Sequence, residues 1–143
     1  MTDIARQRLH EDIIQQFRSG GGHVGGQFEN TPLLLLTTTG ARSGESRTWP
    51  LGYGRDGDRL VVFAANGGRG NRPGWYYNLL ANPAATIEVG TESWPVTATL
   101  LTGDDRERLW ERQLEISPFL ADFQAKLSWE IPVFALTPAS SAA

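Results

Sequence analysis

Apolar side chains recur at helical spacing near the start of the chain. Leu9, Ile13 and Phe17 fall on one face of a helix, with Ile14 beside them. No Gly or Pro interrupts residues 3–18 and a run of three glycines follows, so we expect a helix there. Its apolar face is expected to pack on the core. The alternative is a helix lying on a membrane, which its mixed charges disfavour.

Short runs typical of β-strands dominate the rest of the chain. The run at residues 32–38 is apolar and then Thr-rich. In the run at 47–53 the side chains alternate between two faces, with Trp49 and Leu51 on the same face. Asp56-Gly57-Asp58 indicates one hairpin turn and Gly90-Thr91 another. Several short strands with few helices predict a small barrel. We expect about six strands, over residues 32–38, 47–53, 60–65, 85–89, 94–101 and 131–137.

Three shorter helical segments are expected between these strands. The first covers residues 73–81 and is closed by Asn82-Pro83. Residues 102–105 have the pattern of a capping box before a helix, with Asp104 and Asp105 as its N-terminal charges. Pro118 begins another helical piece before the last strand.

The predicted fold class is therefore mainly β, of the α+β type. We expect one barrel domain over residues 1–143, long enough to bury a core. An N-terminal helix and Gly-rich connector take up residues 1–22, two helices precede the last strand, and residues 138–143 form a tail of small residues.

Composition excludes several classes of protein. With no cysteine, neither a disulfide framework nor a thiolate or zinc centre is available. The longest clean apolar run, residues 33–36, is far shorter than the roughly 20 residues that span a membrane. A pI near 5.3 argues against a nucleic-acid binder. We expect a cytoplasmic protein, and its N-terminus lacks the apolar centre of a signal peptide.

One segment of this acidic chain is rich in arginine and glycine. The net charge is −3, yet six arginines lie between Gly40 and Arg72, opposed by three acids. Such a local basic segment favours a site for phosphate or carboxylate groups of a small ligand. The arginines are Arg42, Arg47, Arg55, Arg59, Arg69 and Arg72.

Familiar catalytic motifs are missing from the sequence. Gly20-x-Gly22-x-x-Gly25 follows a helix and opens none, so it is no dinucleotide fingerprint. No nucleophile elbow surrounds Ser43. His10 and His23, the two histidines, predict neither a metal site nor a Ser-His-Asp triad. A ligand site without a catalytic apparatus of its own is typical of a protein whose cofactor supplies the chemistry.

Five short motifs follow one another along the chain. They are VGGxF at 24–28, LLLLTTTGxRSGxxRxxPL at 33–51, AAxGG at 64–68, PxWYxNLxANP at 73–83 and IPV at 131–133. This ordered series, which covers nearly the whole chain, resembles the deazaflavin (coenzyme F(420))-dependent nitroreductase and quinone reductase family.

The resemblance implies a split β-barrel, with the reduced 8-hydroxy-5-deazaflavin coenzyme F(420) as hydride donor. The turn at Arg42–Ser43 and Arg47 would hold its phosphate and glutamate tail. Trp75 is equally a candidate core residue. The positions that match the family's coenzyme segments are Ala41, Arg42, Ser43, Arg47, Thr48, Trp49, Pro50, Leu51, Gly52, Phe63, Ala64, Ala65, Asn66, Gly74, Trp75, Tyr76, Tyr77 and Asn78.

Departures from the family pattern bear on the acceptor. Nitro-activating relatives carry tyrosines where this chain has Ser117, Leu120 and Phe123, and Trp129 stands where an arginine is common. Relatives also often have Arg-Lys at 41–42 and Ser-Lys at 65–66. The candidate acceptor pocket formed by Ser117, Leu120, Phe123 and Trp129 is thus more apolar than in those relatives and has fewer phenolic proton donors. A flat, apolar quinone is favoured over a nitro compound.

Other interpretations stay open. A split-barrel reductase that uses FMN is the alternative enzyme, and a non-catalytic deazaflavin carrier is the alternative outside enzymology. The resemblance and the charge disfavour a nucleic-acid-binding barrel. A homodimer and a peripheral membrane contact through residues 1–18 are also left open, and no side chain is assigned as catalytic.

Overall fold

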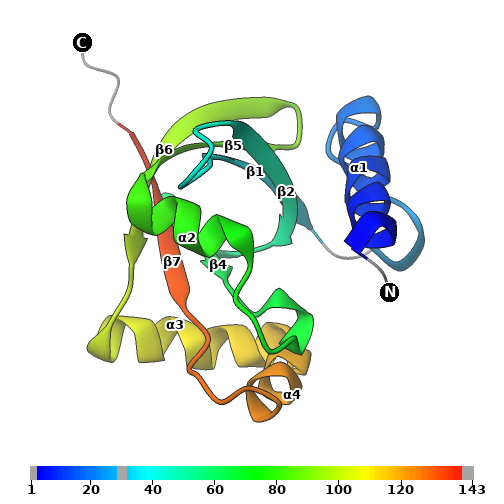
Figure 1. The fold of residues 1–143 in the computed structure, drawn as a ribbon. Coiled ribbons are helices and arrows are strands. Elements are labelled where there is room, and N and C mark those ends of the chain that lie inside the picture. Colours follow the sequence, from blue (N-terminus) through cyan, green and yellow to red (C-terminus); the bar gives the residue numbers. More distant parts are fainter. Residues whose placement is uncertain (1–2, 29–31, 140–143) are drawn as a thin grey trace.

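A curled antiparallel sheet organises the computed structural model, which describes residues 3–28 and 32–139 (Figure 1). The sheet has seven strands in the order β2-β1-β5-β6-β7-β4-β3. The ends of the expected helix and tail, residues 1–2 and 140–143, lie outside the described residues. The elements are α1 (Asp3–Ser19), a 3₁₀ turn η1 (Gly26–Phe28), β1 (Leu33–Thr39), β2 (Ser46–Gly52), β3 (Gly54–Asp56), β4 (Arg59–Phe63), a 3₁₀ turn η2 (Asn66–Gly68), α2 (Gly74–Ala81), β5 (Ala84–Val89), β6 (Glu92–Leu100), α3 (Gly103–Ile116), α4 (Phe119–Ala125) and β7 (Val133–Pro138).

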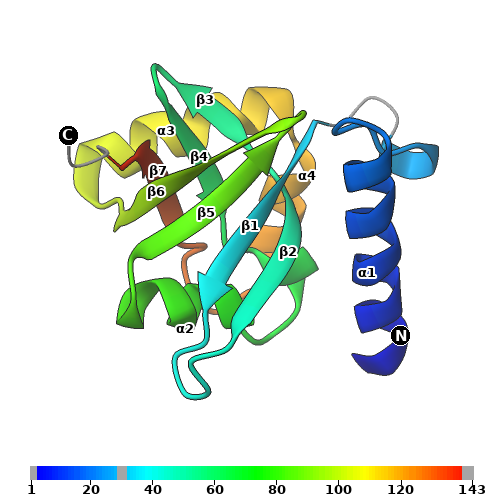
Figure 2. The same cartoon turned by 90° about the horizontal axis from the view of Figure 1, so that it is seen from above.

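The two edges of this sheet are joined by a single residue. β2 forms one edge and β3 the other, yet only Tyr53 separates them along the chain. Figure 2 shows β2 and β3, the two strands that this residue joins. The expected run at 47–53 therefore ends at Gly52, and a seventh strand, missed by the sequence analysis, begins at Gly54. Because one short segment belongs to both edges, the sheet must curl into a barrel.

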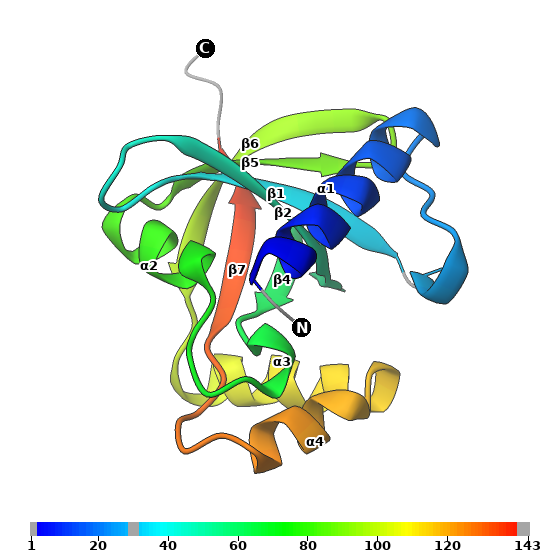
Figure 3. The ribbon, with the colours of Figure 1, turned by 45° about the vertical axis from the view of Figure 1, so that its right-hand side comes forward.

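β1 is buried on both faces, which explains its unbroken apolar run. Leu34 and Leu36 belong to the core inside the barrel. Leu35, on the other face, packs with Ile13 and Phe17 of α1, which are 5% and 1% exposed. Figure 3 shows α1 crossing the outside of the sheet beside β1 and β2. The helical stripe of the sequence is thus used for packing, as expected.

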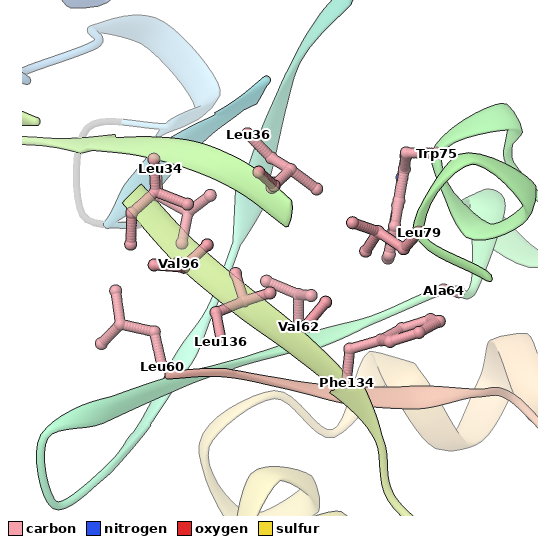
Figure 4. Close-up of a cluster of buried hydrophobic side chains, with 13 residues drawn as sticks. Leu34, Leu36, Leu60, Val62, Ala64, Trp75, Leu79, Val96, Phe134 and Leu136 are labelled. Carbon is pink, nitrogen blue, oxygen red and sulfur yellow. The ribbon is translucent and has the colours of Figure 1, made fainter. Parts of the chain in front are cut away.

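The inner core fills the barrel and is closed by α2 (Figure 4). Leu36, Val62 and Phe134 come from three strands, and Trp75 and Leu79 come from α2. Fully burying an apolar side chain of this size contributes about 1.5–3 kcal/mol. This core fixes α2 against the strands.

A second core joins the outer face of the sheet to α3 and α4. Val61 and Val133 contribute from β4 and β7, and Leu109 and Leu120 contribute from the helices. Figures 1 and 3 show the two helices together on one side of the molecule. β4 and β7 are therefore apolar on both faces, like β1.

The start of α3 differs from the expected capping box. Thr102 occupies the N-cap, but its side chain makes no capping hydrogen bond. Asp105 instead binds Arg59 and Arg108 at 3.1 and 2.9 Å. Asp104 and Asp105 lie in the first turn as expected, where acids complement the helix dipole.

The last strand runs further than the sequence predicted. β7 includes Pro138, which pairs with Val96 of β6, so the expected tail loses its first residue to the sheet. Among residues 3–28 and 32–139, no helix has the length and apolar character needed to cross a membrane.

Candidate functional site

The loop that joins β1 to β2 is held in shape by its own groups. The Gly40 amide donates to the carbonyl of Glu45 at 2.8 Å, and the Gly44 amide donates to that of Gly40 at 3.0 Å. The Ser43 hydroxyl accepts from the Glu45 amide at 3.1 Å. Gly44 has a φ of 71°, which favours glycine. Arg42 is therefore presented on a defined turn.

A buried asparagine fastens this loop to α2. The Asn78 side chain accepts from the Ala41 amide at 2.9 Å and donates to the Thr38 hydroxyl at 3.0 Å. Asn78 is 8% exposed and Thr38 is 2% exposed. Ala41 and Asn78, both predicted at the coenzyme, thus belong to one hydrogen-bonded unit.

The six arginines of residues 40–72 do not gather at one site. Arg59 donates to Asp56 at 2.8 Å and to Asp105 at 3.1 Å. The Arg55 guanidinium lies over the ring of Tyr53, 5.6 Å from its centroid. Acids and an aromatic ring of the protein itself therefore bind part of this positive charge. Fewer arginines remain for an anionic ligand than the sequence analysis counted.

Two arginines of the hairpin stay unpaired. Arg42 and Arg47 are exposed and make no ion pair with any residue that the structure describes. Arg47 lies near the start of β2 and is paired with Thr38 of β1. The Thr38 hydroxyl is the group to which Asn78 donates. A charge without a protein partner, on a fixed hairpin, is suited to bind an anionic ligand.

The acid–arginine cluster beside β3 has a structural role. It comprises Asp56, Arg59, Asp105, Arg108 and Arg112 and joins the β3–β4 turn to α3. Hydrogen bonds from Arg108, and then from Arg59, lower the pKa of Asp56 to about 2. The same two arginines lower the pKa of Asp105.

β2 carries six of the predicted coenzyme residues at an edge of the sheet. The Thr48 hydroxyl lies 2.8 Å from that of Thr37, and Trp49 and Leu51 are half-buried against the inner core. Pro50 has no N–H, which an edge strand tolerates. β2 pairs with β1 alone, so its other side is free of strand partners.

Glycines leave open space around this edge. A side chain added at Gly52 would meet no described atom within 4 Å apart from its chain neighbours. At Gly74 it would lie 3.7 Å from the Trp49 ring, an ordinary contact. Backbone without side chains allows a flat ligand to approach closely.

The end of β4 contributes mainly backbone to the predicted site. Ala64 and Ala65 are 0% and 5% exposed, and the Ala64 amide donates to the carbonyl of Pro132 at 2.9 Å. Phe63 is half-buried, with its ring 6.1 Å from that of Trp110. Asn66, which follows Ala65, has a φ of 50°. Its side-chain amide donates to the carbonyl of Asn71 at 2.7 Å, which closes the glycine-rich loop at residues 66–72.

α2 divides its aromatic residues between core and surface. Trp75 is 2% exposed, and its ring lies 5.9 Å from that of Phe134, so it is a core residue. Tyr76 is half-buried, and Tyr77 is 50% exposed with its ring 5.0 Å from that of Tyr76. Gly74 is exposed at the start of the helix.

Arg72 was counted among the six arginines, but the sequence analysis did not predict its contacts with aromatic rings. Its guanidinium lies 4.5 Å from the ring centroid of Trp129 and 5.4 Å from that of Tyr76. Its Nε is buried and has no hydrogen-bond partner among residues 3–28 and 32–139. The Trp129 indole donates to the carbonyl of Gly70 at 3.2 Å. Arg72 and Trp129 thus hold the glycine-rich loop against the segment before β7.

Three of the four predicted acceptor residues, Leu120, Phe123 and Trp129, belong to the second core or pack against it. Leu120 is 6% exposed, and Phe123 also lies against Gly68. The fourth, Ser117, is half-buried and accepts from the Gln113 amide at 3.2 Å.

A pocket of about 270 Å³ lies beside Ser117 instead, between α3 and the junction of β2 with β3. Tyr53 and Phe63 line it from the sheet, and Leu109, Gln113 and Ile116 line it from α3. Only Phe63 among these was predicted at the site. No single segment of the sequence could reveal the pocket, because its walls lie up to 84 positions apart, from Pro32 to Ile116.

Comparison with known proteins supports the sequence motifs. Residues 7–138 match the model of the F(420)H(2)-dependent quinone reductase family. The chain belongs to this family. An F(420)H(2)-dependent quinone reductase of Mycobacterium tuberculosis is 40% identical over 134 residues, which cover 91% of this chain and 88% of the relative.

Solved structures agree with the family's fold. An F(420)H(2)-dependent reductase is 38% identical, with a TM-score of 0.68 over 73% of this chain and 93% of that one. A second structure, described as a domain-swapped dimer, is 36% identical, with a TM-score of 0.70 over 94% of this chain and 97% of that one. The curled sheet is therefore the split barrel expected of the family.

Proposed function

We propose that this protein reduces a quinone with reduced coenzyme F(420) and binds that coenzyme along β2, from the β1–β2 hairpin to Gly52. One observation carries the assignment of the site. Arg42 and Arg47 make no ion pair with a described residue and lie on a hairpin that Asn78 fixes to α2. Family membership supports the coenzyme and the acceptor class.

The donors of the hairpin suit the anionic part of the coenzyme, its phosphodiester and glutamate carboxylates. Guanidinium groups bind such oxygens in pairs, and both Arg42 and Arg47 are exposed for this purpose. The Ser43 hydroxyl, at the same turn, accepts from Glu45 and keeps its own proton for a ligand oxygen.

The space beside β2 suits the flat ring. Apart from its chain neighbours, no described atom lies within 4 Å of a would-be Cβ at Gly52, so a ring can lie against its backbone. When bound, the reduced coenzyme supplies a hydride from its C5 carbon. Trp49, Leu51 and Tyr76 orient the ring and exclude water, and Trp75 stabilises their support from the core.

The residues at 117, 120 and 123 offer no phenol to an acceptor. Ser117 and Phe123 are half-buried and Leu120 is buried. An acceptor that needs a strong proton donor is disfavoured there, whereas a quinone takes its protons from water or a nearby hydroxyl. We therefore propose quinones, rather than nitro compounds, as the preferred acceptors.

An anaerobic titration tests the function. Protein purified without ligand is titrated with oxidised and reduced coenzyme F(420), and menadione is then added while the coenzyme's visible absorbance is followed. Quinone-dependent oxidation supports the proposal. Tight binding without oxidation by any quinone indicates a carrier, and co-purification of a chromophore with an FMN spectrum indicates the flavin enzyme.

We also propose that the protein forms a homodimer, since the relative described as a domain-swapped dimer aligns with 94% of this chain. Light scattering after gel filtration measures the mass. Membrane contact through residues 1–18 stays a prediction. Ile13 and Phe17 are buried against the sheet, whereas Leu9 is 37% exposed. Sedimentation with lipid vesicles tests it.

A further inference from the structure

We infer that the pocket between α3 and the β2–β3 junction is the binding site of the quinone ring, and that the Gln113 amide binds the quinone oxygen. This inference rests on the proposed function. It moves the acceptor from the four predicted residues to a surface lined by Tyr53, Phe63, Leu109, Gln113 and Ile116.

The size of the pocket selects a small ring system. Its volume, about 270 Å³, lies just below the usual range of roughly 300–1,000 Å³ for sites of drug-sized ligands. One or two fused rings match that space. The three-ring deazaflavin with its ribityl phosphate and glutamate tail does not, so the pocket fits the acceptor and not the coenzyme.

The walls have the polarity that a quinone needs. Val61, Phe63 and Leu109 are apolar side chains of the second core or its margin, and they offer flat burial to a ring. Ile116, at the end of α3, is 68% exposed and stands at the rim. Gln113, 7% exposed, is the buried polar side chain of the lining, whereas Arg55 and Arg112, which also line the pocket, are exposed.

Gln113 is placed in the pocket by two neighbours. Its amide nitrogen donates to the Ser117 hydroxyl at 3.2 Å, which uses one of its two protons. A side chain on Gly54 would collide with the Gln113 amide oxygen, so glycine at this position makes room for the amide. The second N–H and the oxygen remain for a ligand, because no other described group binds them.

An amide matches both oxidation states of a quinone. The quinone takes a hydride from the coenzyme and a proton from water, so that two carbonyl oxygens become hydroxyls. A carbonyl accepts from an N–H, whereas a hydroxyl donates to a C=O, and glutamine carries both groups. A carboxylate only accepts and a guanidinium only donates, so neither would serve substrate and product alike.

The pocket also adjoins the proposed coenzyme surface. Tyr53 directly follows Gly52, where the coenzyme strand β2 ends, and Phe63 is itself a predicted coenzyme residue. An acceptor in the pocket therefore lies at the end of the strand along which we place the coenzyme.

Two substitutions test the site with different chemistry. Ile116→Trp adds bulk at an exposed rim position and should fold normally. We expect it to raise the KM for menadione by roughly tenfold or more, the scale on which apolar pockets discriminate bulk. Gln113→Leu should raise that KM about fivefold through loss of one hydrogen bond. Neither should change the Kd for the coenzyme, measured by calorimetry.

Phe119→Trp is the matched control, because Phe119 is 46% exposed on α4 and does not line the pocket. It should keep the wild-type KM. Wild-type protein that fails to oxidise the coenzyme with any quinone would overturn the proposed function. Wild-type turnover together with an unchanged menadione KM in both Ile116→Trp and Gln113→Leu would overturn the pocket assignment alone.

Discussion

Asn78 of α2 donates its side-chain amide to the Thr38 hydroxyl of β1 at 3.0 Å, across 40 positions of sequence. The same side chain accepts from the backbone of Ala41. α2 and the β1–β2 loop, which both carry predicted coenzyme residues, are thereby fixed relative to each other. The arginines of the hairpin reach a ligand from a rigid base, which reduces the entropy lost on binding.

Replacement of Asn78 should weaken both the fold and the site. Asn78→Ala leaves the buried Thr38 hydroxyl without a partner, and we expect the free energy of unfolding to fall by roughly 1–3 kcal/mol. Coenzyme affinity should fall as well, because the loop is released. Urea unfolding and calorimetry measure the two effects. Leu80→Ala, at an exposed position of the same helix, should change stability by less than about 0.5 kcal/mol. Wild-type affinity in Asn78→Ala would contradict the role of the anchor.

The hairpin arginines should dominate the salt dependence of coenzyme binding. Arg42→Ala and Arg47→Ala should each raise the Kd by roughly tenfold or more, the scale of a charge-assisted hydrogen bond. Added salt should weaken binding more in the wild type than in the double variant, because exposed charges are screened. Arg8→Ala, an exposed arginine of α1, serves as control. Equal affinities in all variants would remove the anion site from this turn.

Acid should release the acid–arginine cluster in a defined window. The pKa of Asp56 is lowered from 3.8 to about 2 by hydrogen bonds from Arg108 and Arg59. A carboxyl whose pKa is lower in the folded state stabilises the protein above its unfolded pKa, and this contribution is lost as the pH falls through its folded pKa. We therefore expect Asp56→Asn to be less stable than wild type at pH 7, with the difference shrinking between pH 4 and pH 2.

Thermal unfolding across this pH range measures the effect. Asp58→Asn is the control, since Asp58 is exposed in the same turn and makes no ion pair with a described residue. A difference between Asp56→Asn and wild type that stays constant down to pH 2 would show that the charge of Asp56 does not stabilise the fold.

Quinones should be reduced far faster than bicyclic nitroimidazoles. The family resemblance implies tyrosines at these positions in nitro-activating members, whereas Ser117, Leu120 and Phe123 carry no phenol, so general-acid assistance of about 10²–10⁴-fold from these three positions is absent here. Anaerobic oxidation of the reduced coenzyme, followed with each acceptor at equal concentration, compares the rates. Nitroimidazole turnover as fast as menadione turnover would refute the argument from the missing phenols.

Local patterns were enough to predict most elements of this fold. The helical stripe of Ile13 and Phe17, the apolar run at residues 33–36 and the turn at 56–58 each predicted an element that the structure contains. These signals depend on neighbouring residues, whose side chains alternate or recur with a fixed period. The ordered motifs likewise predicted the family, because they are read along the chain.

Tertiary structure alone decided how the edges and charges were used. Tyr53 separates two strands at opposite edges of the sheet, and this closure is a property of the whole curled sheet. Arg59 was counted toward an anion site, but Asp105, 46 positions away, binds it. Gln113 gained a place in a pocket only because Gly54 packs against it. Contacts between distant residues depend on packing and burial, which no local period encodes, so the sequence determined the elements and family while the packed fold decided which side chains remain free for a ligand.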